Sequence, residues 1–280
     1  MALLTMKQIE ELSPVFKGTF GHVLARCLLK ITAVDKIAEI YDRHEDVKGP
    51  DFVNAYLKDI GVNYEVSGLE QLQSVTEGPF ITISNHPYGA LDGIILIDLI
   101  GHSRPDYKVM ANKFLSLVKT LQDNFIMVSP EFKLDAKPTQ VSISGVKKSF
   151  THLREGHPLG IFPAGAVSDL NLKEHSIRDR EWQEAALRLI KKAKVPVVPV
   201  RFFDRNSNFF YGLGLVNKTM RVLRLPREVL NKGGKPIRVG IGKVLSVAEM
   251  ECYKTIEDLG IFLRQSVYGM DLPDGFIRRE

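Results

Sequence analysis

The 280-residue sequence has few cysteines and no long apolar run, which argues against a disulfide-rich protein and against a membrane-spanning one. It contains two cysteines, Cys27 and Cys252, which are too few for a disulfide-built scaffold and are typical of a reducing compartment. A membrane-spanning helix needs roughly 20 apolar residues. The longest candidate, Gly93 to Gly101, is short and contains Asp98. The N-terminus also lacks the charged start and apolar core of a signal peptide. We therefore predict that the protein is not integral to a membrane.

Strand-like and helix-like patterns alternate along most of the chain. Short apolar runs bounded by Pro, Gly or Asn predict strands over 79–84, 107–110, 125–128, 159–162 and 195–200. Apolar residues at three- and four-residue steps predict helices over 91–99, 114–121, 141–154 and 181–193, and one or two more within 21–57. This alternation is typical of an α/β fold, so we predict a central, mostly parallel sheet flanked by helices. Residues 1–65 are expected to form an N-terminal helical appendage, packed on a main domain of residues 66–280.

The segment NHPYGALDG (85–93) carries the strongest chemical pattern. His86 follows a predicted strand, and Asp92 begins the next predicted helix. A glycine-containing turn between them can bring the carboxylate to one imidazole nitrogen, which makes His86 a candidate general base and Asp92 its partner. In the alternative interpretation, Asp92 only caps the helix and His86 binds a backbone carbonyl. The spacing by itself leaves both open.

A second turn, IFPAGAVSD (161–169), has the same strand-to-turn arrangement, and its small residues leave room for a ligand. By itself it predicts only a turn. The other histidines are scattered, so no third ligand completes a zinc site with His86, and no metal is expected. The nucleophile elbow Gly-x-Ser-x-Gly is missing, because VSISG (141–145) lacks the first glycine. This argues against an α/β-hydrolase esterase.

Taken together, the segments resemble the glycerolipid (lysophospholipid) acyltransferase family, which includes the 1-acylglycerol-3-phosphate acyltransferases. The order of the His86 and Asp92 block, the Phe162-Pro163-x-Gly165 block and VPVVPV (195–200) is similar to that of the family, over roughly residues 72–203. The resemblance implies an αβ fold and transfer of a fatty acyl group from acyl-carrier protein or acyl-CoA to a lipid hydroxyl. It implies His86 as general base with Asp92 as partner, and no cofactor, metal or acyl-enzyme. Residues 66–280 are then the acyltransferase domain.

Three departures from the family pattern change the expected acceptor. Five residues separate His86 from Asp92 where four are commonest. This form resembles a bacterial branch that includes ornithine- and glycine-type aminolipid O-acyltransferases. Ala164 and Val167 stand where the family usually has Glu and Arg, and Met127 follows a Phe-Ile pair where the family has Arg. The family holds glycerol phosphate with those charged groups, and apolar side chains cannot replace such contacts. We expect a lyso-aminolipid with a free hydroxyl as acceptor, with lysophosphatidic acid as the alternative.

The residues expected to bind substrate lie in and around these blocks. They are Asn85, Tyr88, Gly89, Phe162, Pro163, Gly165, Ser168 and Lys113. For Tyr88 a place in the acyl or acceptor channel and a packed aromatic are both open. Cations that could replace the missing phosphate contacts are Lys113, Arg178, Arg180, Arg201 and Arg205.

Positive charge is concentrated in one segment. The chain has 38 Lys and Arg against 33 Asp and Glu, and residues 217–243 hold eight of the basic residues but one of the acidic ones. Aliphatic residues alternate with these cations, a pattern that favours docking on an anionic lipid surface or an acidic carrier protein. The candidate docking residues are Lys218, Arg221, Arg224 and Arg227. The alternative is a solvated charged face. Without stacking aromatics or a binding motif, nucleic acid is not an expected partner.

We predict an O-acyltransferase of membrane lipid biosynthesis that acts from the cytoplasmic face as a peripheral protein. Its expected partners are the membrane lipid surface and an acyl-carrier protein or CoA thioester. A protein that binds lipid or acyl carrier without catalysis is the competing class.

Overall fold

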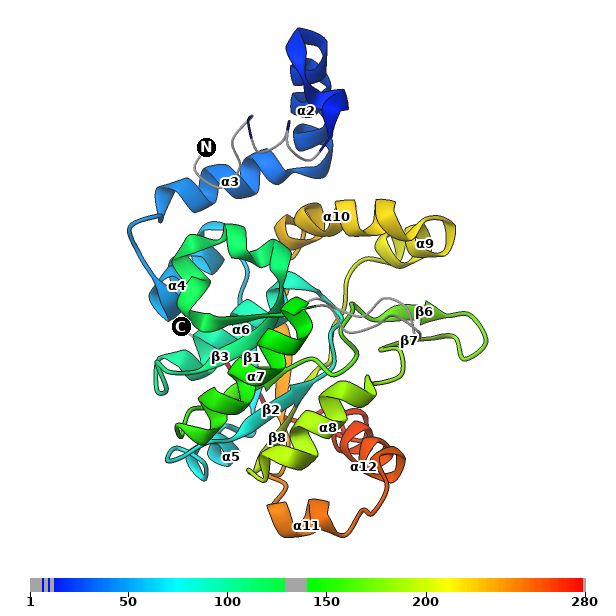
Figure 1. The fold of residues 1–280 in the computed structure, drawn as a ribbon. Coiled ribbons are helices and arrows are strands. Elements are labelled where there is room, and N and C mark those ends of the chain that lie inside the picture. Colours follow the sequence, from blue (N-terminus) through cyan, green and yellow to red (C-terminus); the bar gives the residue numbers. More distant parts are fainter. Residues whose placement is uncertain (1–6, 8–9, 11–12, 129–139, 279–280) are drawn as a thin grey trace.

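The computed structural model describes residues 7, 10, 13–128 and 140–278 (Figure 1). Its main sheet contains β1 (Tyr64–Ser67), β2 (Ile81–Ser84), β3 (Lys108–Asn112), β4 (Phe125–Val128), β5 (Leu159–Ile161), β8 (Val197–Phe202), β9 (Ile237–Ile241) and β10 (Ile277–Arg278). The eight strands lie in the order β10-β1-β9-β8-β2-β5-β3-β4. Every neighbouring pair is parallel except β10 with β1 and β9 with β8. The predicted α/β fold with a mostly parallel sheet is confirmed.

Helices connect the strands and cover both faces of the sheet (Figure 1). The α-helices are α2 (Gly18–Thr32), α3 (Val34–Arg43), α4 (Gly49–Asp59), α5 (Leu69–Gln73), α6 (Ala90–Gly101), α7 (Gln140–Arg154), α8 (Glu184–Ala193), α9 (Asn208–Val216), α10 (Lys218–Leu230), α11 (Val247–Glu251) and α12 (Ile256–Tyr268). Short 3₁₀ helices are η1 (Pro14–Phe16), η2 (Lys113–Leu117) and η3 (Lys119–Asn124). A separate hairpin, β6 (Asp169–Asn171) with β7 (Ser176–Arg178), leaves the sheet after β5.

Two apolar cores hold the layers together, one on each face of the sheet. On one face α4 and α6 pack against β8, with Phe52, Ile95 and Val200 among the buried side chains. On the other face α8 and α12 pack against β2. There Ile83 and Leu263 are fully buried. β2 is covered on both faces, and all four of its residues are buried although its sequence, ITIS, alternates apolar and polar residues. The buried hydroxyls are hydrogen-bonded, that of Thr82 to Tyr107 Oη at 2.7 Å and that of Ser84 to the Asn85 carbonyl at 2.9 Å.

Two helix predictions differ from the structure, and local backbone conformation explains both. Residues 21–57 were expected to form one or two helices, but three cover this range because Ala33 adopts a left-handed conformation (φ 62°) that ends α2 before α3 begins. The predicted helix over 114–121 is instead η2 followed by η3, because Val118 leaves the helical region (ψ 82°) between them. The expected boundary at residue 65 falls inside β1, which pairs with β9; the division into two parts stays a prediction.

None of the helices in the described part of the chain is both long enough and apolar enough to cross a bilayer.

Candidate active site

The two motif segments meet at one edge of the sheet because their strands are parallel neighbours. β2 leads into His86, and β5, which pairs with β2, leads into Phe162. The carboxyl ends of adjacent parallel strands lie at the same edge, where ligands usually bind in α/β folds. The His86 ring stacks on the Phe162 ring with 4.1 Å between their centroids, and Ser168 N–H donates to the His86 carbonyl at 2.9 Å. The two motif segments are therefore in direct contact.

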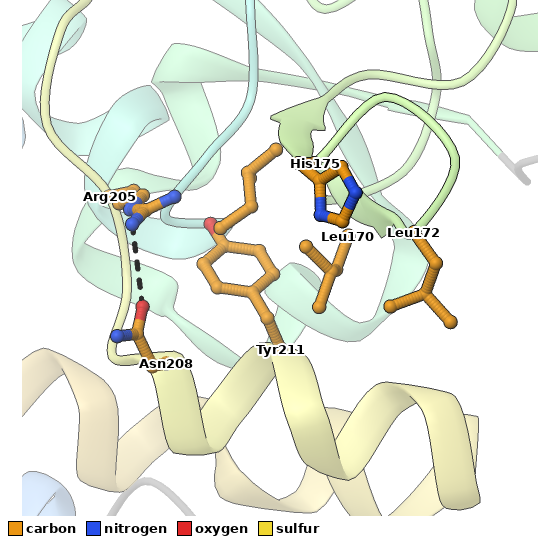
Figure 2. Close-up of a pocket in the computed structure, with 7 residues that line it drawn as sticks. Leu170, Leu172, His175, Arg205, Asn208 and Tyr211 are labelled. Atoms are coloured by element: carbon orange, nitrogen blue, oxygen red, sulfur yellow. Dashed lines mark hydrogen bonds between the residues drawn. The ribbon is translucent and has the colours of Figure 1, made fainter.

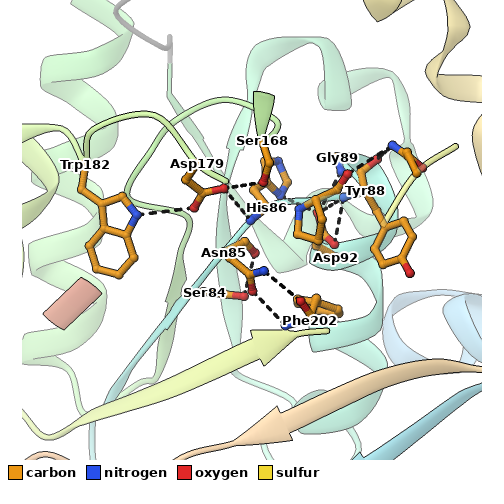
Figure 3. Close-up of polar contacts among 12 residues, drawn as sticks. Ser84, Asn85, His86, Tyr88, Gly89, Asp92, Ser168, Asp179, Trp182 and Phe202 are labelled. Carbon is orange, nitrogen blue, oxygen red and sulfur yellow. Dashed lines mark hydrogen bonds and ion pairs between the residues drawn. The ribbon is translucent and has the colours of Figure 1, made fainter. Parts of the chain in front are cut away.

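His86 and Asp92 are in direct contact (Figure 3). His86 Nδ1 lies 2.7 Å from Asp92 Oδ2, although the two atoms are poorly aligned for a linear hydrogen bond. The Asp92 side chain is fully buried, whereas that of His86 is 17% exposed. The carboxylate therefore sits beside Nδ1 and leaves Nε2 as the nitrogen able to take a proton from a substrate.

Asp92 also caps its helix, so both interpretations open from the sequence hold at once. Its Oδ2 accepts from Gly89 N at 2.8 Å and from Tyr88 N at 3.0 Å, at the start of α6. Burial raises the pKa of Asp92, and the contact with His86 and these two N–H groups oppose part of that rise. One carboxylate thus orders the turn and holds the imidazole.

Gly89 shapes the turn between the two residues. Its φ is +86°, a conformation that side chains with Cβ rarely adopt. A Cβ there would lie 3.1 Å from side-chain atoms of Val167 and of Leu225 in α10. The apolar residue at 167, where the family usually has Arg, therefore packs against the catalytic loop, which we define as residues 85–92.

Three predicted substrate-binding residues are instead internal to the fold. The buried Asn85 amide binds the backbone of Phe202 at both ends. Its Nδ2 donates to the Phe202 carbonyl at 2.9 Å, and Phe202 N–H donates to its Oδ1 at 2.8 Å. Ser168 is 1% exposed and its hydroxyl is bonded to a carboxylate, and Tyr88 is 2% exposed. Burial raises the pKa of Tyr88. Asn85 and Ser168 are thus hydrogen-bonded within the protein, and Tyr88 is a packed aromatic, the second of its two open interpretations. The structure does not support the predicted substrate contact for these three.

The remaining predicted residues take different places. Phe162 covers one face of the His86 ring, and Pro163 is buried with its carbonyl accepting from Gln183 N at 2.9 Å. Gly165 has φ +62°, and a Cβ there would clash with the Gln183 amide. Lys113 begins η2, and its side chain lies outside the described residues.

Asp179 is a second buried carboxylate at this site, and the sequence analysis missed it. It is 4% exposed and accepts from His86 N at 3.1 Å, Ser168 Oγ at 2.6 Å and Trp182 Nε1 at 3.4 Å (Figure 3). Burial raises its pKa. It lies 93 positions from His86 in sequence, between β7 and α8. No local pattern in the sequence predicts such a contact.

The predicted docking residues do not share one face. Arg221 is 5% exposed, forms an ion pair with Asp169 and lies over the Phe210 ring, so its predicted place on a docking surface is wrong. A buried guanidinium needs a carboxylate partner, and Asp169 supplies it. Arg224 is half-buried and bonded to Glu228 at 3.4 Å. The exposed cations of α10 are Lys218 and Arg227.

Among known protein families, a family model described as Acyltransferase matches residues 9–272. The chain belongs to this family. It is an enzyme that transfers acyl groups, and the family predicted from the His/Asp and Phe-Pro-x-Gly segments is confirmed.

Two curated relatives of this acyltransferase have the same name. A lyso-glycine lipid O-acyltransferase of Bacteroides thetaiotaomicron is 28% identical over 248 residues, covering 86% of this chain and 87% of its own length. One of Phocaeicola vulgatus is 27% identical over 227 residues, covering 79% of this chain and 77% of its own length. Among solved structures, the 1-acyl-sn-glycerophosphate acyltransferase PlsC of Thermotoga maritima aligns with 14% identity and a TM-score of 0.47, over 88% of this chain and 92% of its own.

Proposed function

We propose that this acyltransferase moves a fatty acyl group from an acyl thioester, carried by acyl-carrier protein or CoA, to the hydroxyl of a lyso-aminolipid of the glycine type. The observation that carries the proposal is the His86–Asp92 pair beside an apolar Val167, because it combines a general base with a site that lacks the usual phosphate-binding arginine. The names of both relatives support the acceptor class.

The geometry supports a direct transfer. His86 Nε2 takes the proton of the acceptor hydroxyl as its oxygen attacks the thioester carbonyl. The tetrahedral intermediate then collapses, the carbon–sulfur bond breaks, and the thiolate leaves with the proton returned by the imidazolium. Asp92, 2.7 Å from Nδ1, stabilises the positive charge on the ring between these steps.

The surroundings of the pair favour an acceptor without a phosphate at this point. Val167 and Leu225 pack against Gly89, and Ala164 is 4% exposed. Phosphate recognition in a buried site rests on charge-assisted, often bidentate hydrogen bonds, which none of these three side chains can make. A lysolipid whose charge lies farther from its hydroxyl fits such a site better.

A surface of exposed apolar side chains supports work at a membrane. We call the following residues of α2 and α10 the lipid-facing surface: Phe20, Val23, Leu24, Leu28, Ile31, Met220, Val222 and Leu223. Phe20 is 83% exposed, and the two helices are joined by Arg227 Nη1, which donates to the Ile31 carbonyl at 3.0 Å. Exposed cations on the same helices include Arg26, Lys30 and Lys218. Apolar and cationic side chains on neighbouring helices are typical of proteins that bind an anionic lipid surface.

The proposal includes a peripheral position on the cytoplasmic face of the membrane. The thiols of Cys27 and Cys252 are free and exposed, which suits a reducing compartment, and cells keep acyl thioesters there.

An acyl-transfer assay with the purified enzyme tests the proposed function. Acyl-carrier protein and CoA thioesters are each offered with lyso-glycine lipid and, separately, with lysophosphatidic acid. We expect efficient turnover of lyso-glycine lipid with at least one donor and little turnover of lysophosphatidic acid. Comparable or preferred turnover of lysophosphatidic acid would overturn the acceptor assignment.

A further inference from the structure

A cavity beside the catalytic loop belongs to none of the roles assigned so far (Figure 2). It lies between the β6–β7 hairpin and α9 and has a volume of about 260 Å³. Its walls are mostly apolar, with polar groups on the α9 side and at the hairpin; the lining residues are Leu170, Leu172, His175, Ile177, Arg205, Asn208 and Tyr211.

The charge in this cavity has no carboxylate partner. Arg205 Nη2 donates to Asn208 Oδ1 at 3.4 Å, and no Asp or Glu among the described residues lies within ion-pair distance of it. Neighbouring arginines differ: Arg221 pairs with Asp169, and Arg238 pairs with Asp204. An exposed guanidinium at the mouth of an apolar cavity is suited to an anionic ligand, which it can hold through two parallel hydrogen bonds.

The walls of the cavity are tied directly to the catalytic loop. Tyr211 Oη donates to the Pro87 carbonyl at 2.8 Å, next to His86. Asn206, the neighbour of Arg205 in sequence, donates from Nδ2 to the Pro87 and Tyr88 carbonyls at 3.2 and 3.3 Å. The α9 wall of the cavity is therefore hydrogen-bonded to the residue that follows His86 in the catalytic loop.

We propose that this cavity binds the carboxylate end of the acceptor lipid, and the proposal rests on the proposed function. A glycine joined to a lipid through its amino group keeps its carboxylate. The Arg205 guanidinium binds that carboxylate. Asn208 Nδ2 lies next to the guanidinium, because Oδ1 of the same amide accepts from Arg205. Leu170 and Ile177 contact the methylene groups that follow the headgroup, as apolar walls do in lipid and drug-sized ligand sites.

Two substrates of this reaction carry an anionic group that Arg205 can bind. The acceptor carries a carboxylate, and the acyl donor carries phosphates. Steady-state kinetics of Arg205→Ala and Arg205→Lys separate them, with Arg188→Ala on α8 as the control for an exposed arginine. We expect Arg205→Ala to raise KM for lyso-glycine lipid by about 10- to 100-fold, the range for a charge-assisted hydrogen bond, with kcat and donor KM unchanged. Arg205→Lys recovers part of the loss, because the charge stays and the fork geometry is lost.

An acceptor analogue whose carboxylate is replaced by a neutral amide completes the test. The wild-type enzyme is expected to use it as poorly as Arg205→Ala uses the natural acceptor, and Arg205→Ala is expected to lower its turnover no further. If Arg205→Ala raises the donor KM instead, the cavity holds the donor phosphate and the proposal is wrong. If the wild-type enzyme is active on lyso-glycine lipid and Arg205→Ala leaves the acceptor KM unchanged, the proposal is also wrong. A wild-type enzyme inactive on that lipid overturns the proposed function itself.

Discussion

The catalytic loop and the lipid-facing surface are held by opposite kinds of contact. In the loop, the backbone of His86, Tyr88 and Gly89 is bonded to the buried carboxylates Asp179 and Asp92. On α2, by contrast, Phe20 is 83% exposed, and the helix joins α10 through a single described polar contact from Arg227. The loop is complete within the chain and is therefore rigid before substrate arrives. The surface leaves apolar side chains exposed, which is the reason for proposing that it binds lipid.

Replacing His86, the proposed base, is expected to lower activity more than any other substitution. We expect His86→Ala to lower kcat for acyl transfer by about 10³- to 10⁴-fold, since the acceptor hydroxyl then has no proton acceptor. Asp92→Asn should come close to this, because it removes the charge at Nδ1. The matched control is His157→Ala, since His157 Nδ1 lies at the same distance, 2.7 Å, from Asp106 Oδ2 in a more exposed pair elsewhere in the fold. Equal losses in both histidine variants, or none in His86→Ala, would contradict the assigned base.

Replacing Asp179 tests whether this second buried carboxylate holds the catalytic loop in place. Asp179→Asn keeps the shape but weakens the bonds from His86 N and Ser168 Oγ, so we expect kcat to fall by about 10- to 100-fold. Steady-state kinetics with both substrates at saturation measure this fall.

Ser168→Ala is the control for Asp179→Asn, because it removes one bond and leaves the carboxylate. It should lower kcat less than Asp179→Asn does, since the bond from His86 N to the carboxylate stays. Equal losses in the two variants would show that Asp179 matters only through its bond with Ser168.

Placing a negative charge on the lipid-facing surface tests whether it binds a membrane. Phe20→Asp should weaken binding to anionic phospholipid vesicles by about tenfold, as burying one large apolar side chain contributes about 1.5–3 kcal/mol. Ile261→Asp, on α12, is the control because Ile261 is also exposed, at 64%. Vesicle sedimentation measures both. Should Phe20→Asp change the oligomeric state and leave vesicle binding unaltered, this surface contacts a second copy and not a membrane.

The ion pair that buries Arg221 gives the smallest expected effect, and it depends on pH. Burial opposes ionisation of Asp169, but Arg180 and Arg221 outweigh it, so the pKa of Asp169 is lowered in the folded state. Its contribution to stability is therefore complete at pH 7 and is lost as the pH falls through that lowered value, below about pH 4. Asp169→Asn should lower the free energy of unfolding by about 1–2 kcal/mol at pH 7. Urea unfolding at pH 7 and pH 3 checks this, and an equal loss at both values would exclude the ion pair as the cause.

Much of the site was predictable wherever neighbours in space are also neighbours in sequence. The turn from β2 to α6 places His86 and Asp92 together within one strand–loop–helix unit, and glycines at 89 and 165 mark the turns that require positive φ. Asp179 was not predictable in this way, because it reaches His86 from 93 positions away. Arg221 was misjudged for a related reason: charge spacing along a helix does not show whether a carboxylate such as Asp169 faces it.

By itself the sequence determined the alternation of strands and helices and the placing of His86 and Asp92 on either side of one turn. These follow from apolar periodicity and from residues a few positions apart, whose contacts local backbone geometry already dictates. The resemblance to the family added that Ala164 and Val167 stand where it usually has charged residues. Only the tertiary structure decided that Asn85, Tyr88 and Ser168 are internal and that Arg205 lacks a carboxylate partner among the described residues. Burial and ion pairing depend on which distant segments the sheet brings together, and that information is not written in any one stretch of the chain.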